Sequence, residues 1–371
     1  MTIHSYEVEE NDATSHSIRG KTSDYLMRAS QHLPDQISKR IETTPPQPNP
    51  AGRSLLQLIS DITVGCENAV IALDWTFASR LSDEVPAYAS DQDYTSVVVP
   101  HGDSPFWNTV RRPKSFDCLL ENADFDSPDD LFEVTFSTWA DKAKYDYILM
   151  PNELTARRVT PFADPEQIEV LGSPRYSLEW LDILSDIDSG PVPQHSAALN
   201  VVFFTRQSHY YISEPAVRDT VELVTKFPNT HLVVKEHPRG HIFGQETELN
   251  DLTNCDIVRD GVESAALTRW GDIFLSLGTT ITFEPIMRKK PVLAVEYAHG
   301  NYTTVARYFS NADIRSRDDL YDTMHAINES DGEFYGADEY RQFVEEMVTA
   351  SNDSVLDSYA KFFESRLATE S

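Results

Sequence analysis

The sequence lacks any run of apolar residues near the ~18 that a transmembrane helix requires. Its first residues, MTIHSYEVEENDATSHS, are polar and acidic, with neither a basic n-region nor an apolar h-region. They therefore differ from a secretory signal peptide. These two absences predict a cytoplasmic protein.

Cysteine is scarce as well. Cys66, Cys118 and Cys255 lie far apart in the sequence and form no CxxC pair. This spacing excludes a disulfide framework and the usual zinc-binding patterns. It predicts three reduced thiols.

Basic residues are few: 31 Lys and Arg, only 10 of them Lys, stand against 60 Asp and Glu, and the net charge is −29. Such a surface repels nucleic acid and anionic membranes, so we expect neither as a general partner. Self-repulsion also destabilises the compact state in dilute salt. The composition fits an extreme halophile, since charges are screened within ~3 Å at 1 M salt. An acidic protein in an ordinary cytoplasm is the alternative.

Several familiar site motifs are missing. The chain has no GxGxxG after its first predicted strand, and no GxxxxGK[ST], HExxH or GxSxG. DxD occurs at 91–93, 124–126 and 186–188, but a chain with 60 acidic residues readily produces it by chance. We therefore predict no metal site and no bound cofactor.

What the chain does have is enough apolar material for a full core, with 40% hydrophobic and 11% aromatic residues. Single cores stop growing near ~250–300 residues, so 371 residues predict two domains. Residues 1–50 are polar and end in four prolines within 45–50, which predicts an N-terminal extension with one helix around 23–40.

Short apolar strands alternate with helical patterns at ~30-residue spacing, which is typical of parallel βαβ units. Predicted strands are 68–75, 95–100, 145–151, 199–205, 231–237, 256–258, 272–277 and 291–297, and predicted helices are 54–62, one from Asn152, 214–227 and two within 337–366. A linker rich in Gly, Pro, Ser and Asp separates the halves at 185–197. The prediction is an α/β protein with domains at 51–188 and 196–336, and with C-terminal helices at 337–371 that pack back.

Ligands of open α/β sheets bind at the carboxyl ends of strands, so residues that follow strands are the site candidates. His101 comes directly after the strand 95–100, where a neutral imidazole can act as a general base or simply satisfy loop hydrogen bonds. Ser173 and Arg175 lie in the turn LGSPR, where Arg175 suits either a phosphate or a nearby carboxylate.

Basic side chains gather after two further strands. Arg206 follows 199–205, while Lys235, His237 and Arg239 lie in VVKEHPRG at the end of 231–237. In a chain that otherwise avoids basic residues, this gathering predicts an anionic ligand.

The stretch SLGTTITFEPIMRKKPVLAVEY offers a turn after the strand 272–277. Gly278 permits close approach, and Thr279 and Thr280 can cap a following helix whose N-terminus attracts an anion. Glu284, one turn along, can accept hydrogen bonds from sugar hydroxyls or be an exposed carboxylate of a structural helix. Lys289 and Lys290 are expected at the negative end of that helix.

Taken in order, HG after a strand, LGSPR, VKEHPRG and SLGTT…FEP…KKPVL resemble a GT-B transferase over about residues 95–300. The chain is similar to the CDP-glycerol glycerophosphotransferase-like and capsular-polysaccharide glycosyltransferase families. SLGTTITFEP is also similar to the GTxxFE pattern of the UDP-N-acetylglucosamine 2-epimerase fold. The first 90 residues match neither pattern.

This resemblance implies two Rossmann-like domains facing across a cleft, with the nucleotide donor held by the second. It implies that His101 is the base for the acceptor and that His237 lies near the donor phosphates. It further implies that Thr279 and Thr280 bind the diphosphate, followed by the acidic Glu284. Such families need no bound metal.

The expected function is metal-independent transfer of a glycosyl or polyol-phosphate group from a nucleotide-sugar or CDP-polyol donor to a glycan or lipid-linked acceptor, in surface polysaccharide or glycan synthesis. His101 and His237 are the expected catalytic residues, and the expected donor-binding residues are Arg206, Lys235, Arg239, Gly278, Thr279, Thr280 and Glu284. Two alternatives are a nucleotide-sugar epimerase or hydrolase of the same fold, and a non-catalytic binding protein of polysaccharide assembly.

Overall fold

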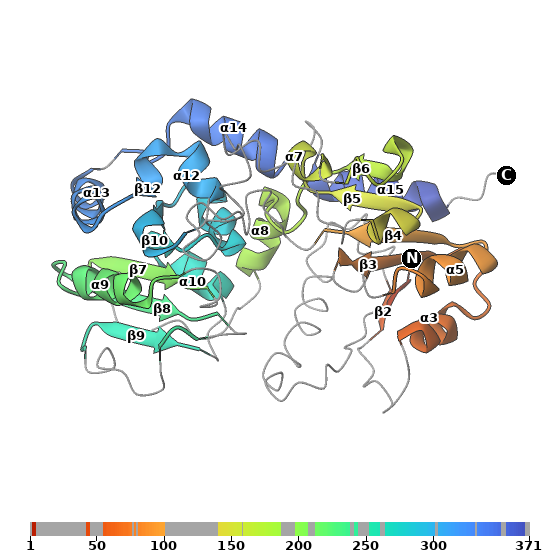
Figure 1. Cartoon of the computed structure of the whole chain (residues 1–371), viewed down its shortest axis with the longest axis horizontal. Coiled ribbons are helices and arrows are strands. Elements are labelled where there is room, and N and C mark those ends of the chain that lie inside the picture. The colour runs from red at the N-terminus through yellow and green to blue at the C-terminus, as the bar shows by residue number, and fades with distance from the viewer. Residues whose placement is uncertain are drawn as a thin grey trace, which may run out of the picture. The chain divides into compact units, whose positions relative to one another are not determined.

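The computed structural model describes residues 2–4, 42–44, 55–75, 78, 81–100, 140–157, 159–186, 197–206, 212–237, 241–243, 252–259, 264–300, 303–330, 332–349 and 354–367. The chain divides into two compact units. Unit 1 comprises Met1–Gly102, Thr135–Asp188 and Met347–Ser371, and unit 2 comprises Asp103–Val134 and Ser189–Glu346. Each unit has a parallel sheet with helices between its strands (Figure 1), which confirms the α/β class. The domain limits expected from the sequence remain predictions.

Unit 1 is built on a parallel sheet in the order β3-β4-β5-β6. Its strands are β3 (Val70–Asp74), β4 (Thr95–Val99), β5 (Tyr147–Met150) and β6 (Ile168–Val170). Its helices are α3 (Leu55–Thr63), α5 (Glu84–Asp91), α7 (Glu153–Ala156), α8 (Leu178–Asp186) and α15 (Val355–Leu367). A separate parallel pair joins β1 (Thr2–His4) to β2 (Glu42–Thr44).

Successive side chains of a strand point to opposite faces of its sheet, and β4 shows what covers each face. Val97 belongs to a cluster with Phe362 of α15, whereas Val98 belongs to the larger cluster that contains Val85 and Ala89 of α5. The last helix of the chain therefore packs on one face of the unit 1 sheet, and α5 packs on the other.

Unit 2 is built on a six-stranded parallel sheet in the order β12-β11-β10-β7-β8-β9. Its strands are β7 (Leu199–Phe204), β8 (Thr230–Lys235), β9 (Cys255–Val258), β10 (Ile273–Ser276), β11 (Val292–Val295) and β12 (Asp313–Ile314). Its helices are α9 (Glu214–Thr225), α10 (Ser264–Trp270), α11 (Phe283–Met287), α12 (Thr304–Tyr308), α13 (Arg317–Glu329) and α14 (Ala337–Met347), the last of which ends one residue into unit 1.

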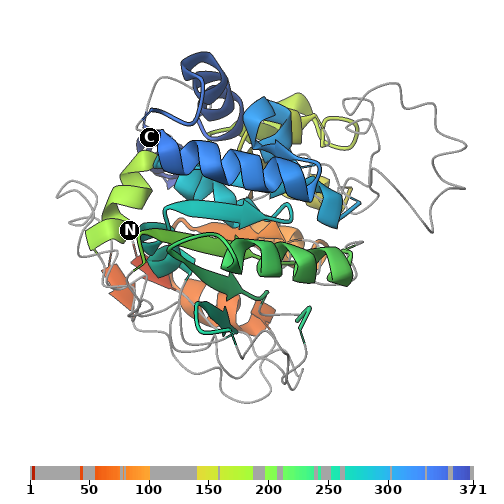
Figure 2. The ribbon, with the colours of Figure 1, turned by 90° about the vertical axis from the view of Figure 1, so that its left-hand side faces the viewer.

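Helices cover both faces of the unit 2 sheet. α9 and α13 lie side by side on one face (Figures 1 and 2), where Val201 and Phe203 of β7 join a core with Val221 and Leu320. On the other face the ring of Phe204 stacks on Phe274 at 6.1 Å. Burial on both faces explains why these strands read as continuous apolar runs rather than as alternating ones.

The eight predicted strands are all present within a few residues of their expected limits. β6 and β12, with three and two residues, are too short to carry a periodic signal. Asn152 caps α7 as expected, since its side chain accepts a hydrogen bond from the Thr155 N–H at 2.8 Å. Cys66 and Cys255 are free thiols, and Cys118 lies outside the described residues.

No helix in the described parts of the chain is both long and apolar enough to span a bilayer.

Two glycines of unit 1 provide a matched stability test. Both have a left-handed backbone, with φ +92° at Gly172 and +80° at Gly65. A Cβ at 172 would lie 2.8 Å from both Val348 O and Val355 Cγ2, whereas one at 65 would meet nothing within 4 Å. We expect Gly65→Ala to cost only the backbone strain of about 1–2 kcal/mol. Gly172→Ala should cost a further ~1–3 kcal/mol for overpacking.

Urea unfolding of both variants measures this difference. Equal losses would show that the C-terminal segment yields freely to the added methyl group.

Candidate active site

The strand order of unit 2 indicates where on its sheet a ligand would bind. β7 is the first strand of this unit in the chain; β8 and β9 follow on one side of it, and the chain then crosses to β10 on the other side. This is the doubly wound order, in which ligands bind beyond the carboxyl ends of the strands where the direction reverses. Here that point lies between the ends of β7 and β10, and Arg206 and Gly278 each come two residues after the end of one of these strands.

Arg206 and Gly278 meet at this point. The Arg206 side chain is buried, at 3% exposure, although it carries a full charge. A Cβ on Gly278 would lie 3.6 Å from Arg206 Nη1 and 2.9 Å from Thr303 Cγ2. Gly278 also has φ +85°, a conformation that glycine adopts without strain. The turn after β10 therefore brings the backbone close to the guanidinium group of Arg206, which follows the neighbouring strand β7.

Ser276 holds this turn in place. Its buried hydroxyl accepts hydrogen bonds from the backbone N–H groups of Gly278 and Thr279, at 3.0 and 3.4 Å. The predicted helix cap is wrong: among the described contacts, the Thr279 side chain makes no capping hydrogen bond. Thr280 begins a 3-10 turn to Thr282, and α11 after it has only five residues. So short a helix has no substantial macrodipole, because few peptide dipoles add up.

Glu284 is not an exposed carboxylate. It is 4% exposed, and its Oε1 accepts a hydrogen bond from Thr268 Oγ1 of α10 at 2.7 Å. This bond ties α11 to α10 beneath the turn.

The two lysines follow the carboxyl end of α11, as expected, but their side chains interact with other parts of unit 2. Lys290 Nζ donates to the carbonyls of Thr268, Arg269 and Gly271, at 3.1, 2.7 and 2.8 Å. It thus caps the carboxyl end of α10 rather than that of the helix it follows, because the tight turn after α11 directs it there. Burial lowers the pKa of Lys290. Lys289 forms a surface ion pair with Glu333 at 2.9 Å.

Two of the predicted site residues near the end of β8, Lys235 and His237, are described by the structure and lie in different surroundings. Lys235 Nζ donates to the carbonyl of Arg259 at the end of β9, at 2.8 Å, so its ammonium is directed toward the neighbouring strand. His237 follows directly at the carboxyl edge and is half-buried. Arg239 lies outside the described residues, as does His101.

Ser173 and Arg175 belong to unit 1 rather than to the donor edge of unit 2. Ser173 is buried, and its N–H donates to the Val348 carbonyl at 2.7 Å. Arg175 is exposed, with its guanidinium 5.5 Å from the centre of the Tyr176 ring.

Three residues of the carboxyl edge escaped prediction: Ser276, Glu296 and Thr303. Glu296 follows β11 and is 5% exposed, and it accepts a short hydrogen bond from the Thr303 hydroxyl. Thr303 also caps α12 by accepting from the Ala306 N–H at 3.3 Å. Ser276 could have been found, since a serine two residues before a glycine is a typical ST-turn. Nothing local marks Glu296 in a chain with 60 acidic residues.

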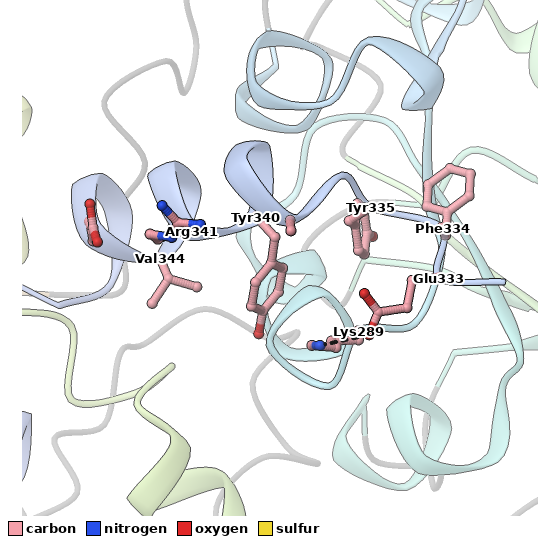
Figure 3. A pocket seen from close by; sticks show the side chains of 9 residues that line it. Lys289, Glu333, Phe334, Tyr335, Tyr340, Arg341 and Val344 are labelled. Carbon is pink, nitrogen blue, oxygen red and sulfur yellow. Dashed lines mark hydrogen bonds and ion pairs between the residues drawn. The ribbon is translucent and has the colours of Figure 1, made fainter.

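A pocket of about 330 Å³ lies elsewhere in unit 2, between α14 and the turn after α11 (Figure 3). Its polar groups are engaged with the protein. Tyr340 donates to the Met287 carbonyl at 3.0 Å, and Tyr335 Oη donates to Lys290 O and accepts from the Val292 N–H. Val292 begins β11, so this pocket lies at the amino ends of the strands, away from Arg206 and Gly278.

No group of three or more His, Cys, Asp and Glu side chains in the described ranges is arranged to hold a metal ion.

Two solved structures are similar to this chain over most of its length. UDP-GlcNAc 2-epimerase from Methanocaldococcus jannaschii aligns with a TM-score of 0.50 and 13% identity, over 87% of this chain and 88% of that one. A glycosyltransferase from Rickettsia africae ESF-5 aligns with a TM-score of 0.50 and 11% identity, over 100% of this chain and 98% of that one. No protein-family model and no curated protein matches the sequence. At these identities the likeness concerns the fold alone, and it confirms the prediction from the motifs: the chain has the GT-B fold.

Proposed function

We propose that the chain is a metal-independent transferase, which moves a glycosyl or polyol-phosphate group from a nucleotide-activated donor to an acceptor hydroxyl in surface polysaccharide or glycan synthesis. The buried guanidinium of Arg206 beside Gly278 supports this proposal most strongly. In a chain of net charge −29, an arginine placed at the switch point of a doubly wound sheet suits an anionic ligand.

In this proposal Arg206 binds the donor diphosphate through its planar fork of N–H groups. In glycosyl transfer the sugar C–O bond breaks and negative charge grows on the leaving nucleoside diphosphate. In polyol-phosphate transfer the P–O bond inside the diphosphate breaks and the charge grows on the leaving nucleoside monophosphate. In either reaction a fixed cation in a water-poor site stabilises the growing charge. Gly278 lets the phosphates approach the turn closely. Glu284 accepts a ribose hydroxyl, for which Thr268 already orients its carboxylate.

The two histidines take the remaining roles. His101 removes the proton from the acceptor hydroxyl as it attacks, and His237 donates a hydrogen bond to the donor phosphates. A glycan or a lipid-linked glycan is the proposed acceptor.

A thermal-shift screen tests the donor site. Full-length protein is heated with UDP-, CDP-, GDP- and CMP-linked donors, in low salt and in molar salt. A ligand at 100 times its Kd stabilises the folded state by about 2.7 kcal/mol, so a true donor raises the Tm by several degrees. If no nucleotide raises the Tm at either salt concentration, the proposal is wrong and a non-catalytic role gains support. The same screen tests the high-salt interpretation, which requires a lower Tm in dilute salt.

An epimerase or hydrolase that acts on the nucleotide sugar itself is the second candidate. The stretch SLGTTITFEP favours it through its similarity to the GTxxFE pattern, although it has three residues rather than two between GT and FE. A UDP-GlcNAc 2-epimerase is also among the proteins of similar fold. NMR of the donor incubated without an acceptor separates the two, since only the epimerase or hydrolase changes the sugar signals under these conditions.

A further inference from the structure

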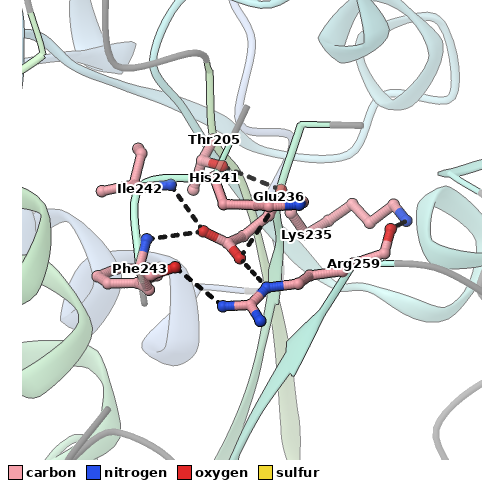
Figure 4. Close-up of polar contacts among 7 residues, drawn as sticks. All are labelled: Thr205, Lys235, Glu236, His241, Ile242, Phe243 and Arg259. Atoms are coloured by element: carbon pink, nitrogen blue, oxygen red, sulfur yellow. Dashed lines mark hydrogen bonds and ion pairs between the residues drawn. The ribbon is translucent and has the colours of Figure 1, made fainter. Parts of the chain in front are cut away.

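Glu236, between two predicted donor-site residues, is completely buried, at 0% exposure. Its Oε1 accepts hydrogen bonds from the backbone N–H groups of Ile242 and Phe243, at 2.8 and 2.9 Å (Figure 4). Its Oε2 accepts from Arg259 Nε at 2.6 Å. His241 Nδ1 lies 3.6 Å from the same oxygen.

Arg259 connects this carboxylate to the rest of the sheet edge. It follows β9, and besides Glu236 it donates from Nη2 to the Phe243 carbonyl at 2.9 Å. Its own carbonyl accepts from Lys235 Nζ at 2.8 Å. Figure 4 shows that side chains from the ends of β8 and β9 and the backbone at 242–243 converge on the carboxylate of Glu236.

This arrangement joins two points of the chain on either side of the HPRG segment. Glu236 lies immediately before His237, and the amides that it binds come six and seven residues later. A carboxylate that accepts two backbone N–H groups and a charged side chain fixes both points. The chain is thus anchored at the residue before His237 by a contact that core packing does not require, because a buried charge is often replaced by apolar side chains without loss of stability.

We propose that Glu236 is a positioning residue, which holds His237 at the carboxyl edge of the sheet through the amides of Ile242 and Phe243, and that Arg259 is its charge partner. A fixed imidazole at this edge matters because His237 is proposed to bind the donor phosphates there. The inference therefore rests on the proposed function. The placement of the His237 side chain can nevertheless be measured without any donor.

The test compares Glu236→Gln with the wild-type chain. The glutamine oxygen can still accept from both amides, but its –NH₂ group then faces Arg259 Nε, so two donors oppose each other. We record the ring ¹H–¹⁵N signals of the histidines in full-length protein, with His237→Ala identifying the signal of interest. We expect that signal to shift or broaden in the Gln variant. The Kd for the nucleotide found by thermal shift should rise about 10- to 100-fold, as for the loss of a charged hydrogen bond.

Tyr335→Phe is the matched control. It removes a buried hydroxyl of unit 2 that makes two hydrogen bonds, at the opposite edge of the sheet. We expect it to lower the Tm while the His237 signal and the nucleotide Kd stay unchanged. If Glu236→Gln behaves in the same way, with a lower Tm and an unmoved His237 signal, Glu236 only stabilises the fold and the proposal is overturned.

Arg259→Met provides a second route, which also serves if the Gln variant does not fold. It removes the charge partner and leaves the carboxylate bound to the two amides, and it should move the same His237 signal. In the double variant the opposed donors are gone, so the loss of affinity should be smaller than the product of the two single losses. If the loss of nucleotide affinity in the double variant equals the product of the two single losses, Glu236 and Arg259 do not act as a pair.

The nucleotide affinity tests the proposed function and the histidine signals test the positioning role, so either proposal can be contradicted while the other stands. If the wild-type chain binds no nucleotide, the proposed function fails, and the His237 signal still decides whether Glu236 positions that residue. If the nucleotide binds and neither Glu236→Gln nor Arg259→Met moves the His237 signal, the positioning role alone is wrong.

Discussion

We expect the substitution Gly278→Ala to weaken nucleotide binding by about 100-fold or more, a loss near 2.7 kcal/mol. The added methyl group would be placed 2.9 Å from Thr303 Cγ2 and 3.6 Å from Arg206 Nη1, on a backbone with φ +85°. Relief of this overlap requires the turn, or the two side chains, to move at the point where the diphosphate is proposed to bind. Isothermal titration with the donor nucleotide measures the loss.

Thr303 offers a way to separate the overlap from the backbone strain. Thr303→Ser deletes the methyl group that an alanine at 278 would touch, and keeps the hydroxyl that donates to Glu296 and accepts from the Ala306 N–H. Adding Thr303→Ser to Gly278→Ala should therefore restore part of the affinity. If the double variant binds no better than Gly278→Ala alone, the overlap with Thr303 is not the cause of the loss.

Gly271→Ala is the matched control for general destabilisation. A Cβ there would lie 2.7 Å from Val202 Cγ2 and 2.9 Å from Phe274 Cζ, at the amino end of β10. It should lower the Tm through overpacking of about 1–3 kcal/mol and leave the nucleotide Kd within about threefold. An equal loss of affinity in both variants would place the site elsewhere.

The second large effect concerns the two histidines. We expect His101→Ala and His237→Ala each to abolish transfer, with rates lower by roughly 10²–10⁴-fold for the base and a comparable loss for the phosphate ligand. Both variants should remain folded, since a half-buried His237 contributes little to the core. Initial rates with the donor from the thermal screen, at saturating acceptor, measure the effect.

His325→Ala serves as the control, because this histidine lies on α13, far along the chain from the predicted site residues, with its side chain half exposed and 3.1 Å from Glu329. Its rate should equal that of the wild-type chain. Turnover near the wild-type level by both His101→Ala and His237→Ala would show that neither histidine takes part in transfer.

Much of the fold followed from local patterns. The strands of unit 2 are buried on both faces, so each reads as an apolar run that ends where the chain leaves the core, and Arg206 and Gly278 could be placed at those ends in advance. The turn at 276–282 was only partly predicted. Threonines are good helix caps in general, but here Thr279 makes no capping hydrogen bond among the described contacts, and the helix after the turn has only five residues.

Glu284, Glu236 and Lys290 show where sequence reasoning reached its limit. The sequence predicted a ligand-facing or exposed carboxylate at Glu284, a departure from a motif at Glu236 and a charge at a helix end for Lys290, but it did not reveal the buried hydrogen bonds that each makes within the protein. Their partners, Thr268, Arg259 and the end of α10, lie some 16 to 23 residues away in the chain. No periodicity or spacing within one segment reveals a contact between segments.

Local hydrophobic pattern and turn chemistry are enough to predict the α/β class, the order of the strands along the chain and the kinds of side chain that follow them. They do not predict that β10 lies beside β7, which brings Gly278 close to Arg206, or that a buried Glu236 joins the two sides of the HPRG segment. Those contacts are seen only in the folded chain, because the burial of whole sheet faces chooses the neighbours in a parallel sheet and sums contributions from residues far apart in the sequence.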